Sequence, residues 1–387
     1  MFKVGKLFTT MKVSQRLNSI EMSGIRKMFD IASPTSINLG LGEPDLLPPK
    51  KAIDGMTLAA ENGLNKYGPT AGIMELRESV AKKYSAYWSG LKANNVMITP
   101  SGSSALLEIA MTIIDPGDHI LTPSPGFVIY GPHAKLAGGT FTDYKMSGPD
   151  FQPDLEDIKS KITPATKAII VNNPSNPTGS ILNEETFKGL LDIAEDNDLT
   201  IVSDEVYDSF IYEGKHLSFL PHLDRSIVVG GFSKMMAVTG WRMGFLMANE
   251  GIMEDLIKMQ YHLCASPNMP AMYGALAAMP DIESYLKDAR TIFKRRRDLI
   301  VERINEIEGM HIEAPKGAFY AFPSYDLDMK SADLAMELAR NGLICTPGSA
   351  FGSYGEGHLR FSYAADETKI SKGMDILAET YAKLRKE

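Results

Sequence analysis

The sequence predicts an α/β protein whose mostly parallel sheet contains one antiparallel strand and is flanked by helices, with a smaller α+β domain. Three observations lead to this class: short apolar runs alternate with helical patterns, one pair of runs is joined too closely for a parallel crossover, and the C-terminal part mixes strands with helices. The chain has 387 residues and a mass of 42.4 kDa. That length favours two domains over one.

The expected strands of the sheet are short apolar runs rich in Ile and Val, which is typical of a sheet covered on both faces. They are residues 95–100, 119–122, 167–171, 200–203, 226–230 and 244–248. Helical patterns at 105–114 and 184–196 lie between them, and such alternation predicts parallel pairing. Only about a dozen residues join 226–230 to 244–248. Because a parallel crossover needs at least that length and usually a helix, we expect this pair to be antiparallel.

The C-terminal part predicts the smaller α+β domain. Residues 290–308 and 332–340 have helical patterns, a stripe from Ile370 to Leu384 predicts a last helix, and 317–323 and 358–363 are expected strands. The N-terminal segment is expected to join them. The predicted division is therefore a large domain over residues 46–280 and a discontinuous small domain of residues 1–45 and 281–387.

A basic run, Arg295–Arg297, lies within one of these helical patterns. We interpret it as the solvated face of a helix, because the chain as a whole is acidic.

Composition and charge exclude several classes of protein. Hydrophobic residues make up 44% and charged residues 23%, and 40 basic against 48 acidic residues give a net charge of −8. Such values are those of a globular chain, and net acidity argues against nucleic acid or an anionic membrane as the main partner. No apolar run approaches the ~18 residues of a membrane-spanning helix. The first 20 residues lack a signal-peptide core.

The chain has two cysteines, Cys264 and Cys345. Two cysteines imply no disulfide framework, and we expect both to be buried as small apolar residues. Together with the N-terminus, this predicts a cytoplasmic enzyme.

Four segments after expected strands carry the candidate chemistry. They are Ser101–Ser104 (SGSS), Asn172–Gly179 (NNPSNPTG), Ser203–Tyr207 (SDEVY) and Gly231–Gly244 (GFSKMMAVTGWRMG). Because α/β sheets bind ligands at the carboxyl ends of their strands, we expect these loops to form one site.

Lys234 and Arg242 lie in the last of these segments. A lysine beside a second cation in a partly dry site has a lowered amine pKa and becomes nucleophilic. An arginine can hold a phosphate by paired hydrogen bonds. A nucleophilic lysine with a phosphate-binding arginine suggests pyridoxal phosphate, which needs both. Taken alone, two such residues are more often exposed loop side chains.

The other three segments supply complementary groups. Asp204 could pair with a protonated pyridine nitrogen and the Tyr207 hydroxyl could hold a phenolic oxygen, although Asp204 and Glu205 could also be ordinary loop carboxylates. The two prolines of NNPSNPTG fix a sharp turn and can force a cis bond, so that Asn176 projects its amide from a rigid platform. The SGSS serines could bind an anion at a helix N-terminus or simply cap the helix.

In combination, these segments resemble those of the class I/II aminotransferases, which are fold-type-I pyridoxal-phosphate-dependent enzymes, and in particular aspartate aminotransferase-like members. Further matching landmarks are GEPD at 42–45, YGPTAGIMELR at 67–77, PSPGFVIY at 123–130 and HLRFSY at 358–363. The resemblance implies that the chain moves the amino group of an L-amino acid, of aspartate type or of broad specificity, to a 2-oxo acid such as 2-oxoglutarate.

The resemblance also implies a role for each matching residue. Lys234 would form the Schiff base with the cofactor aldehyde and then move the proton at the substrate Cα. Asp204 would pair with the pyridine nitrogen, Tyr207 and Asn176 would bind the phenolic oxygen, and Phe127 would stack on the ring.

The remaining matches concern the phosphate and the substrate. The residues that match the phosphate cup are Gly102, Ser103, Ser104, Ser233 and Arg242. Tyr67 matches a tyrosine that reaches the phosphate of the partner subunit's cofactor, which implies a homodimer with shared active sites. Arg360 would bind the substrate α-carboxylate, since a planar fork suits a carboxylate, and Gly42 and Asn176 would complete the substrate site. No metal is expected.

The sequence leaves the substrate and one rival activity open. Ser103 stands where some aspartate-using relatives have a lysine that contacts the substrate side chain, and Arg26 of the SGIR segment could meet a second carboxylate or lie on the surface. A carbon–sulfur β-lyase of the same fold would use the same cofactor residues. A non-catalytic regulator is disfavoured because the landmarks begin close to the N-terminus, and a nicotinamide dehydrogenase because no GxGxxG follows a first strand.

Overall fold

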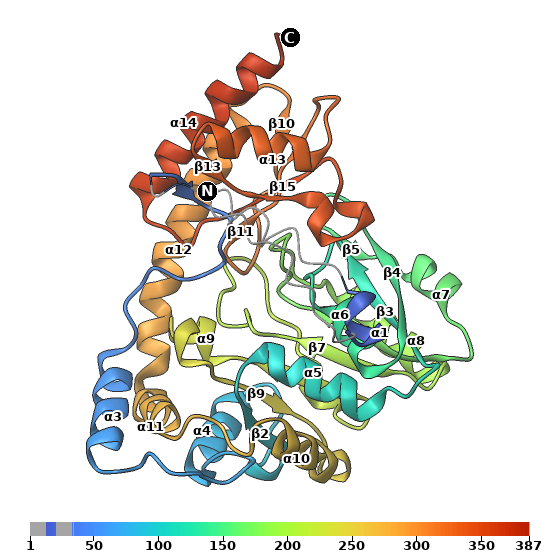
Figure 1. Ribbon diagram of the computed structural model, residues 1–387, viewed down its shortest axis with the longest axis vertical. Coiled ribbons are helices and arrows are strands. Elements are labelled where there is room, and N and C mark those ends of the chain that lie inside the picture. The colour runs from blue at the N-terminus through green and yellow to red at the C-terminus, as the bar shows by residue number, and fades with distance from the viewer. Residues whose placement is uncertain (1–12, 21–32, 34, 387) are drawn as a thin grey trace.

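The computed structural model describes residues 13–20, 33 and 35–386 (Figure 1). In this part of the chain the largest sheet has eight strands in the order β2-β9-β8-β7-β6-β3-β4-β5. Their bounds are β2 (Val96–Thr99), β3 (His119–Ser124), β4 (Thr140–Ser147), β5 (Gln152–Pro153), β6 (Thr166–Asn172), β7 (Thr200–Asp204), β8 (Ser226–Gly230) and β9 (Gly244–Met247).

The pairing of these strands confirms the predicted fold class. β4, β3, β6, β7 and β8 pair in parallel, while β9 is antiparallel to both β8 and β2. The antiparallel relation expected for 226–230 and 244–248 is therefore confirmed. The sequence analysis missed β4 and the two-residue β5, which pairs antiparallel with β4 at the sheet edge. β4 mixes exposed polar residues with buried ones, so a search for continuous apolar runs does not find it.

Two hydrophobic cores lie on opposite sides of the sheet, because successive side chains of a strand point to opposite faces. In β6, Ile169 and Val171 belong to one core and Ala168 and Ile170 to the other. The second core is closed by α5 (Gly102–Ile113), α6 (Tyr130–Ala137) and α10 (Glu250–Cys264). The first includes residues of α4 (Met74–Tyr84), α8 (Glu184–Asp196) and α11 (Met269–Ala278). α3 (Lys50–Glu61) packs on α11, and α7 (Leu155–Lys161) packs on β4.

The remaining strands form three small sheets, shown at the top of Figure 1. β1 (Ile37–Asn38) pairs with β13 (Leu343–Ile344), β10 (Met310–His311) with β12 (Ser324–Tyr325), and β15 (Leu359–Ser362) with β11 (Tyr320–Ala321) and β14 (Thr346–Pro347). α13 (Ser331–Arg340) and α14 (Glu367–Leu384) pack with them. The long α12 (Ile282–Asn305) runs up to them from beside α11 (Figure 1).

One expectation for these segments needs correction, and the domain division is not decided. The strand expected at 317–323 is reduced to Tyr320–Ala321, because Ala318 has a positive φ of 55° that interrupts an extended chain. Residues 37–38 join a small sheet as expected, but α1 (Gln15–Asn18) contacts α6, and Lys135 Nζ donates to the Ser19 carbonyl at 2.9 Å. The division of the chain at residues 45/46 and 280/281 stays a prediction.

Two smaller findings concern the cysteines and the character of the helices. The expected burial is confirmed for Cys345 and is wrong for Cys264, which is partly exposed at the end of α10, and both thiols are free. Within the described ranges, no helix has both the length and the apolar character to cross a bilayer.

The interpretation of the run Arg295–Arg297 as a solvated helix face is wrong for Arg296 and Arg297. Arg295 is exposed, but the Arg296 and Arg297 side chains are only 8% and 3% exposed. Arg296 donates to both carboxylate oxygens of Asp45 at 2.7 and 3.0 Å, and Arg297 donates to Glu213 at 2.7 Å. Consecutive residues of a helix point in different directions, and acidic partners from distant segments make the burial of two of them tolerable.

The buried pair predicts a stability difference within this run. We expect Arg296→Ala to lower the free energy of unfolding by roughly 2 to 3 kcal/mol, a little below the value for a fully buried pair because Asp45 is 30% exposed. Arg295→Ala is the matched control, since its exposed pair with Glu367 should contribute at most about 1 kcal/mol. Urea denaturation followed by circular dichroism measures both. Equal effects would contradict the assignment.

Candidate active site

A cavity of about 360 Å³ lies at the carboxyl ends of β6, β7 and β8, beside the N-terminus of α5. The parallel order of these strands brings their following loops to one edge of the sheet, as the sequence predicts. The predicted site residues that line it are Gly42, Gly102, Ser103, Phe127, Asn176, Asp204, Tyr207, Ser233, Lys234, Arg242 and Arg360. Tyr67 and Ser104 do not line it.

Lys234 lies in the short helix α9 (Phe232–Met235), directly after β8. Its amine donates a hydrogen bond to the carbonyl oxygen of Gly42. Burial, helped by the cations Arg360 and Arg242, lowers the pKa of Lys234 to about 8 against the opposing charges of Glu43 and Asp204. The amine can therefore lose its proton close to neutral pH, as a nucleophile or general base must.

Asp204 ends β7 and is 3% exposed. Burial raises the pKa of Asp204 to about 6, although the Tyr130 hydroxyl, which donates to its Oδ2 at 2.8 Å, stabilises the charged form. The Val206 N–H also donates to Oδ1 at 3.4 Å, but the carboxylate has no ion-pair partner in the described part of the chain. The site therefore favours a ligand that presents a positively charged N–H group.

The turn after β6 positions Asn176. The Asn173–Pro174 and Asn176–Pro177 bonds are both cis, as the sequence allowed. The Asn172 side chain accepts from the backbone N–H of Asn176 at 2.7 Å and donates to the carbonyl of Asp204 at 2.9 Å. The turn is thus tied to the end of β7, which places Asn176 and Asp204 on one cavity wall.

Arg360 reaches the cavity from β15 of a small sheet and is 2% exposed. Its guanidinium donates to Asn176 Oδ1 at 3.0 Å, to the carbonyl of Gly40 and to Thr346 Oγ1 at 3.2 Å, which are all neutral oxygens. Its Nε has no hydrogen-bond partner in the described part of the chain. A buried guanidinium with neutral partners favours an anion, and a carboxylate fits its planar fork.

The N-terminus of α5 presents backbone N–H groups beside Arg242. Ser101 caps the helix, and its Oγ accepts from the Ser104 N–H at 3.0 Å, so the capping alternative is confirmed for Ser101. Gly102 and Ser103 remain on the cavity wall. Arg242 is exposed, with its backbone at φ 57°, and donates to the Thr239 carbonyl at 3.0 Å. A helix N-terminus and an arginine together suit a phosphate.

Tyr67 differs from the other predicted site residues because its side chain is 90% exposed. Arg26 of the SGIR segment lies outside the described residues.

Two functional residues escaped the sequence analysis. Tyr320 lies within the 317–323 run, which carried no signal beyond strand propensity; its hydroxyl meets that of Tyr207 at 2.7 Å and its ring lies 4.7 Å from the Arg360 guanidinium. A Cβ on Gly42 would come within 1.8 Å of the Tyr320 hydroxyl, so only glycine fits there. Tyr130, the partner of Asp204, stands in the PSPGFVIY landmark but was given no role.

Comparison with known proteins decides the family. The model of the family described as aminotransferase class I and II matches residues 34–377. The chain belongs to the class I and II aminotransferases. It is 40% identical to a probable aspartate aminotransferase of Methanocaldococcus jannaschii, over 95% of this chain and 100% of that one, and 37% identical to aromatic-amino-acid aminotransferase 2 of Thermococcus litoralis, over 94% and 97%.

Solved structures of aminotransferases have the same fold. The aspartate aminotransferase of Thermus thermophilus with maleate superposes with a TM-score of 0.91 at 30% identity, over 96% of this chain and 100% of that one. An alanine aminotransferase of Pyrococcus furiosus gives 0.90 at 32% identity, over the same shares. The curated relatives and the solved structures both support an aminotransferase activity for this chain.

The burial of Asp204 predicts a pH-dependent stability change. A carboxyl whose pKa rises from near 4 to about 6 on folding destabilises the folded state by about 3 kcal/mol above pH 6, and this effect disappears as pH falls below 4. We therefore expect Asp204→Asn to stabilise the cofactor-free protein at pH 8 and to change it little at pH 4. Urea unfolding at both pH values measures this. An unchanged or lower stability at pH 8 would contradict it.

Proposed function

We propose that this protein is a pyridoxal-phosphate-dependent aminotransferase that moves the amino group of an L-amino acid, of aspartate type or of broad specificity, to a 2-oxo acid such as 2-oxoglutarate. One observation carries the proposal. Lys234 with its lowered pKa, the buried carboxylate of Asp204 and the buried guanidinium of Arg360 all line one cavity, and neither Asp204 nor Arg360 has an ion-pair partner among the described residues.

The residues present fit pyridoxal phosphate. Asp204 offers a carboxylate for the ring nitrogen, Tyr207 and Asn176 offer polar groups for the phenolic oxygen, and Phe127 offers an aromatic face. The groups suited to the phosphate are Gly102, Ser103, Ser233 and Arg242. When bound, the cofactor supplies a carbonyl group that takes up an amine and a ring that stabilises negative charge on the neighbouring carbon.

The chain's own residues direct that chemistry. Asp204 holds a proton on the ring nitrogen, since a buried carboxylate is stabilised by a cationic partner. Arg360 binds the substrate α-carboxylate and so orients the Cα–H bond towards Lys234. Lys234, once neutral, removes that proton and later returns it as a general acid. Tyr320 packs on the Arg360 guanidinium and bonds the Tyr207 hydroxyl, so it holds the two binding groups in register.

The substrate class rests on Arg360 and on the relatives. An aspartate-type or broad donor is supported by relatives described as aspartate and aromatic-amino-acid aminotransferases and by the Thermus structure with maleate, a dicarboxylate. Ser103 offers no positive charge for a second carboxylate, so recognition of one requires a cation elsewhere.

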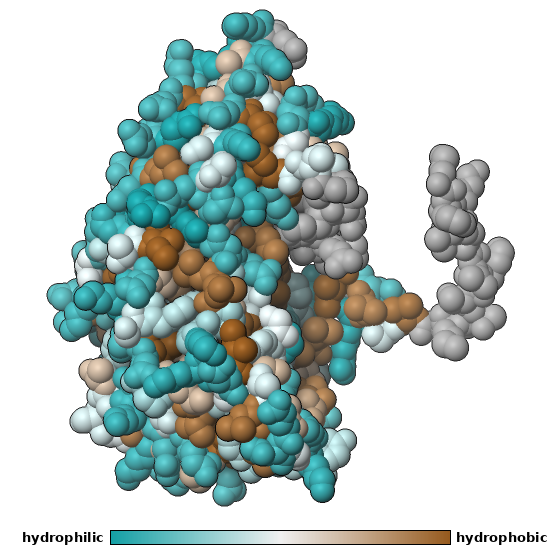
Figure 2. Space-filling model, turned by 90° about the vertical axis from the view of Figure 1, so that its left-hand side faces the viewer, coloured by the Kyte–Doolittle hydropathy of each residue, from teal (hydrophilic) through white to brown (hydrophobic). Residues whose placement is uncertain are grey.

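We also propose a homodimer with shared active sites, acting in the cytoplasm. Tyr67, whose match reaches a partner's phosphate, is 90% exposed and lies outside its own cavity. Large apolar residues are exposed nearby in sequence, among them Leu47 at 82% and Leu58 at 58%. Figure 2 shows such brown residues at the surface of the lower half of the molecule, on the side where α3 lies. Burial of this surface against a second copy would remove it from water.

The absorbance of the purified protein tests the core of the proposal. We expect a visible band from bound cofactor that is lost in Lys234→Ala, together with at least about a 10²-fold fall in amino transfer to 2-oxoglutarate, because the base is removed. Lys159→Ala, an exposed lysine on α7, is the control. A panel of amino donors defines specificity.

Two results would overturn this assignment. A colourless protein that ignores added pyridoxal phosphate would reject the cofactor. Pyruvate and ammonia formed without any 2-oxo acid acceptor would favour the carbon–sulfur lyase.

Hybrid dimers test the shared site. Chains with Tyr67→Ala and chains with Lys234→Ala should each form poorly active homodimers, but a hybrid should regain activity, because one of its sites has an intact Lys234 and the partner's intact Tyr67. Light scattering should give about twice the 42.4 kDa of one chain. No recovery in co-expressed hybrids, or a monomer, would contradict the shared site.

A further inference from the structure

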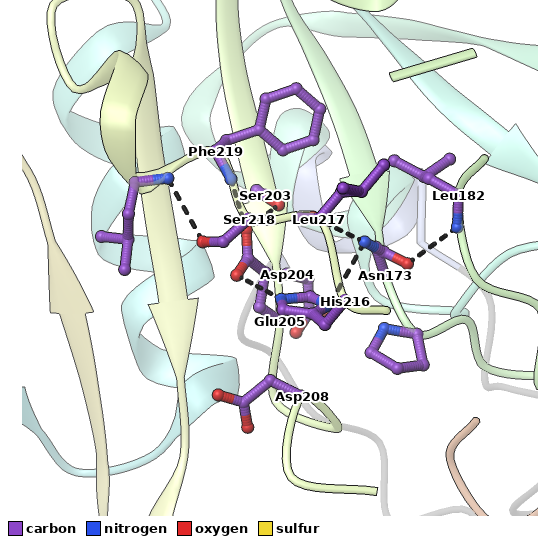
Figure 3. Close-up of polar contacts among 12 residues, drawn as sticks. Asn173, Leu182, Ser203, Asp204, Glu205, Asp208, His216, Leu217, Ser218 and Phe219 are labelled. Carbon is purple, nitrogen blue, oxygen red and sulfur yellow. Dashed lines mark hydrogen bonds and ion pairs between the residues drawn. The ribbon is translucent and has the colours of Figure 1, made fainter. Parts of the chain in front are cut away.

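A second polar cluster lies directly behind Asp204, away from the cavity (Figure 3). Its centre is Glu205 and His216, whose side chains are 1% and 3% exposed and whose Oε2 and Nε2 atoms lie 2.8 Å apart. The sequence analysis gave Glu205 no role other than that of an ordinary loop carboxylate. Burial of two ionisable groups carries a desolvation penalty that an apolar pair of the same size would not have. Their place next to Asp204 therefore suggests a functional role.

The Glu205 carboxylate accepts hydrogen bonds on both oxygens. Its Oε1 accepts from the Ser203 hydroxyl at 2.9 Å and from the Phe219 N–H at 3.0 Å, while Oε2 faces His216. Three donors therefore converge on the Glu205 carboxylate. Side chains alternate along a strand, so Ser203 and Glu205 anchor one face of the β7 end while Asp204 projects from the other.

The other ring nitrogen of His216 faces the turn that carries Asn176. His216 Nδ1 lies 3.4 Å from Asn173 Nδ2, and the Asn173 amide is oriented by the Leu182 N–H at 3.0 Å and the Leu217 carbonyl at 2.9 Å. An amide nitrogen only donates, so Nδ1 accepts and the ring proton lies on Nε2, towards Glu205. His216 therefore bridges the end of β7 to the turn after β6.

The backbone makes the same connection. The Asn173 N–H donates to the Asp204 carbonyl at 3.0 Å. A displacement of the His216 side chain would therefore also displace Asp204 and the turn that holds Asn176.

We propose that Glu205 and His216 are positioning residues for Asp204, which lock it to the Asn173 turn and place a fixed negative charge behind it. This inference rests on the proposed function for its consequence, namely that the fixed charge strengthens retention of a proton on the cofactor ring nitrogen. Coulomb interaction is strong in such a dry site.

The electrostatics support this arrangement. After burial, the Glu205 charge is a further cause that raises the pKa of Asp204. Burial alone would lower the pKa of His216, but Glu205 and, more weakly, Asp208 raise it overall. The Tyr87 ring covers the imidazole edge to face at 5.5 Å. Protonation of His216 at acid pH would cancel the Glu205 charge and turn a second donor towards the Asn173 amide.

The test compares substitutions that separate shape, charge and hydrogen bonding. Glu205→Gln keeps shape and removes the charge. His216→Gln can keep an amide donor towards Glu205, whereas His216→Phe keeps only a ring. The matched control is His119→Gln, since His119 is also buried in the sheet between two threonines, Thr142 and Thr166, but at the opposite strand ends.

A first readout needs no cofactor. In cofactor-free protein, carbon-13 NMR should find that Glu205→Gln lowers the pKa at which Asp204 titrates, while His119→Gln leaves it unchanged. An unshifted Asp204 titration in Glu205→Gln would overturn the inference whether or not the proposed function holds.

A second readout uses the loaded enzyme. Glu205→Gln and His216→Phe should still bind pyridoxal phosphate but should shift the pH dependence of its absorbance and of the nitrogen-15 signal of its labelled ring nitrogen. We expect kcat/KM to fall about tenfold or more, as when a residue that orients an active-site ligand is removed, and His216→Gln to recover most of it. Wild-type spectra in both variants, or equal losses in His119→Gln, would overturn the positioning role. Wild-type protein that binds no cofactor would instead reject the proposed function.

Discussion

The buried carboxylate of Asp204 is the constraint around which the site is organised. A carboxylate in a dry environment is unstable unless a cation or several donors face it, and the described part of the chain supplies the Tyr130 hydroxyl and the Val206 N–H but no ion-pair partner. The position therefore destabilises the protein alone and becomes favourable with a cationic ligand. A cationic ligand that pairs with Asp204 removes this destabilisation, and the removal adds to the binding free energy of the ligand.

The same principle applies at the other end of the cavity. Arg360 is buried among neutral oxygens and aromatic rings, and it too favours a charged partner, here an anion. Lys234 lines the same cavity, with its amine pKa lowered by burial. Under the proposed function, the cofactor ring nitrogen would meet Asp204 and the substrate carboxylate would meet Arg360, and this fixes the orientation in which the substrate Cα faces Lys234.

The sequence analysis identified most of the site because the site follows from local rules. Loops after parallel strands share one edge of the sheet, so the spacing of apolar runs was enough to bring Asn176, Asp204 and Lys234 together. It failed where long-range partners decide the outcome. Arg296 and Arg297 looked solvated because their acidic partners, Asp45 and Glu213, are far away in the chain.

By itself, the sequence determined six of the eight strands of the large sheet, its one internal antiparallel strand and the residue types that carry the chemistry, since these depend on periodicity, turn residues and short motifs. Only the tertiary structure decided how those groups are tuned. Burial sets the pKa of Lys234 and Asp204, and Tyr130, Tyr320 and His216 act through contacts between segments with no pattern in common. Desolvation and second-neighbour hydrogen bonds are properties of the packed chain, and no local stretch of sequence encodes them.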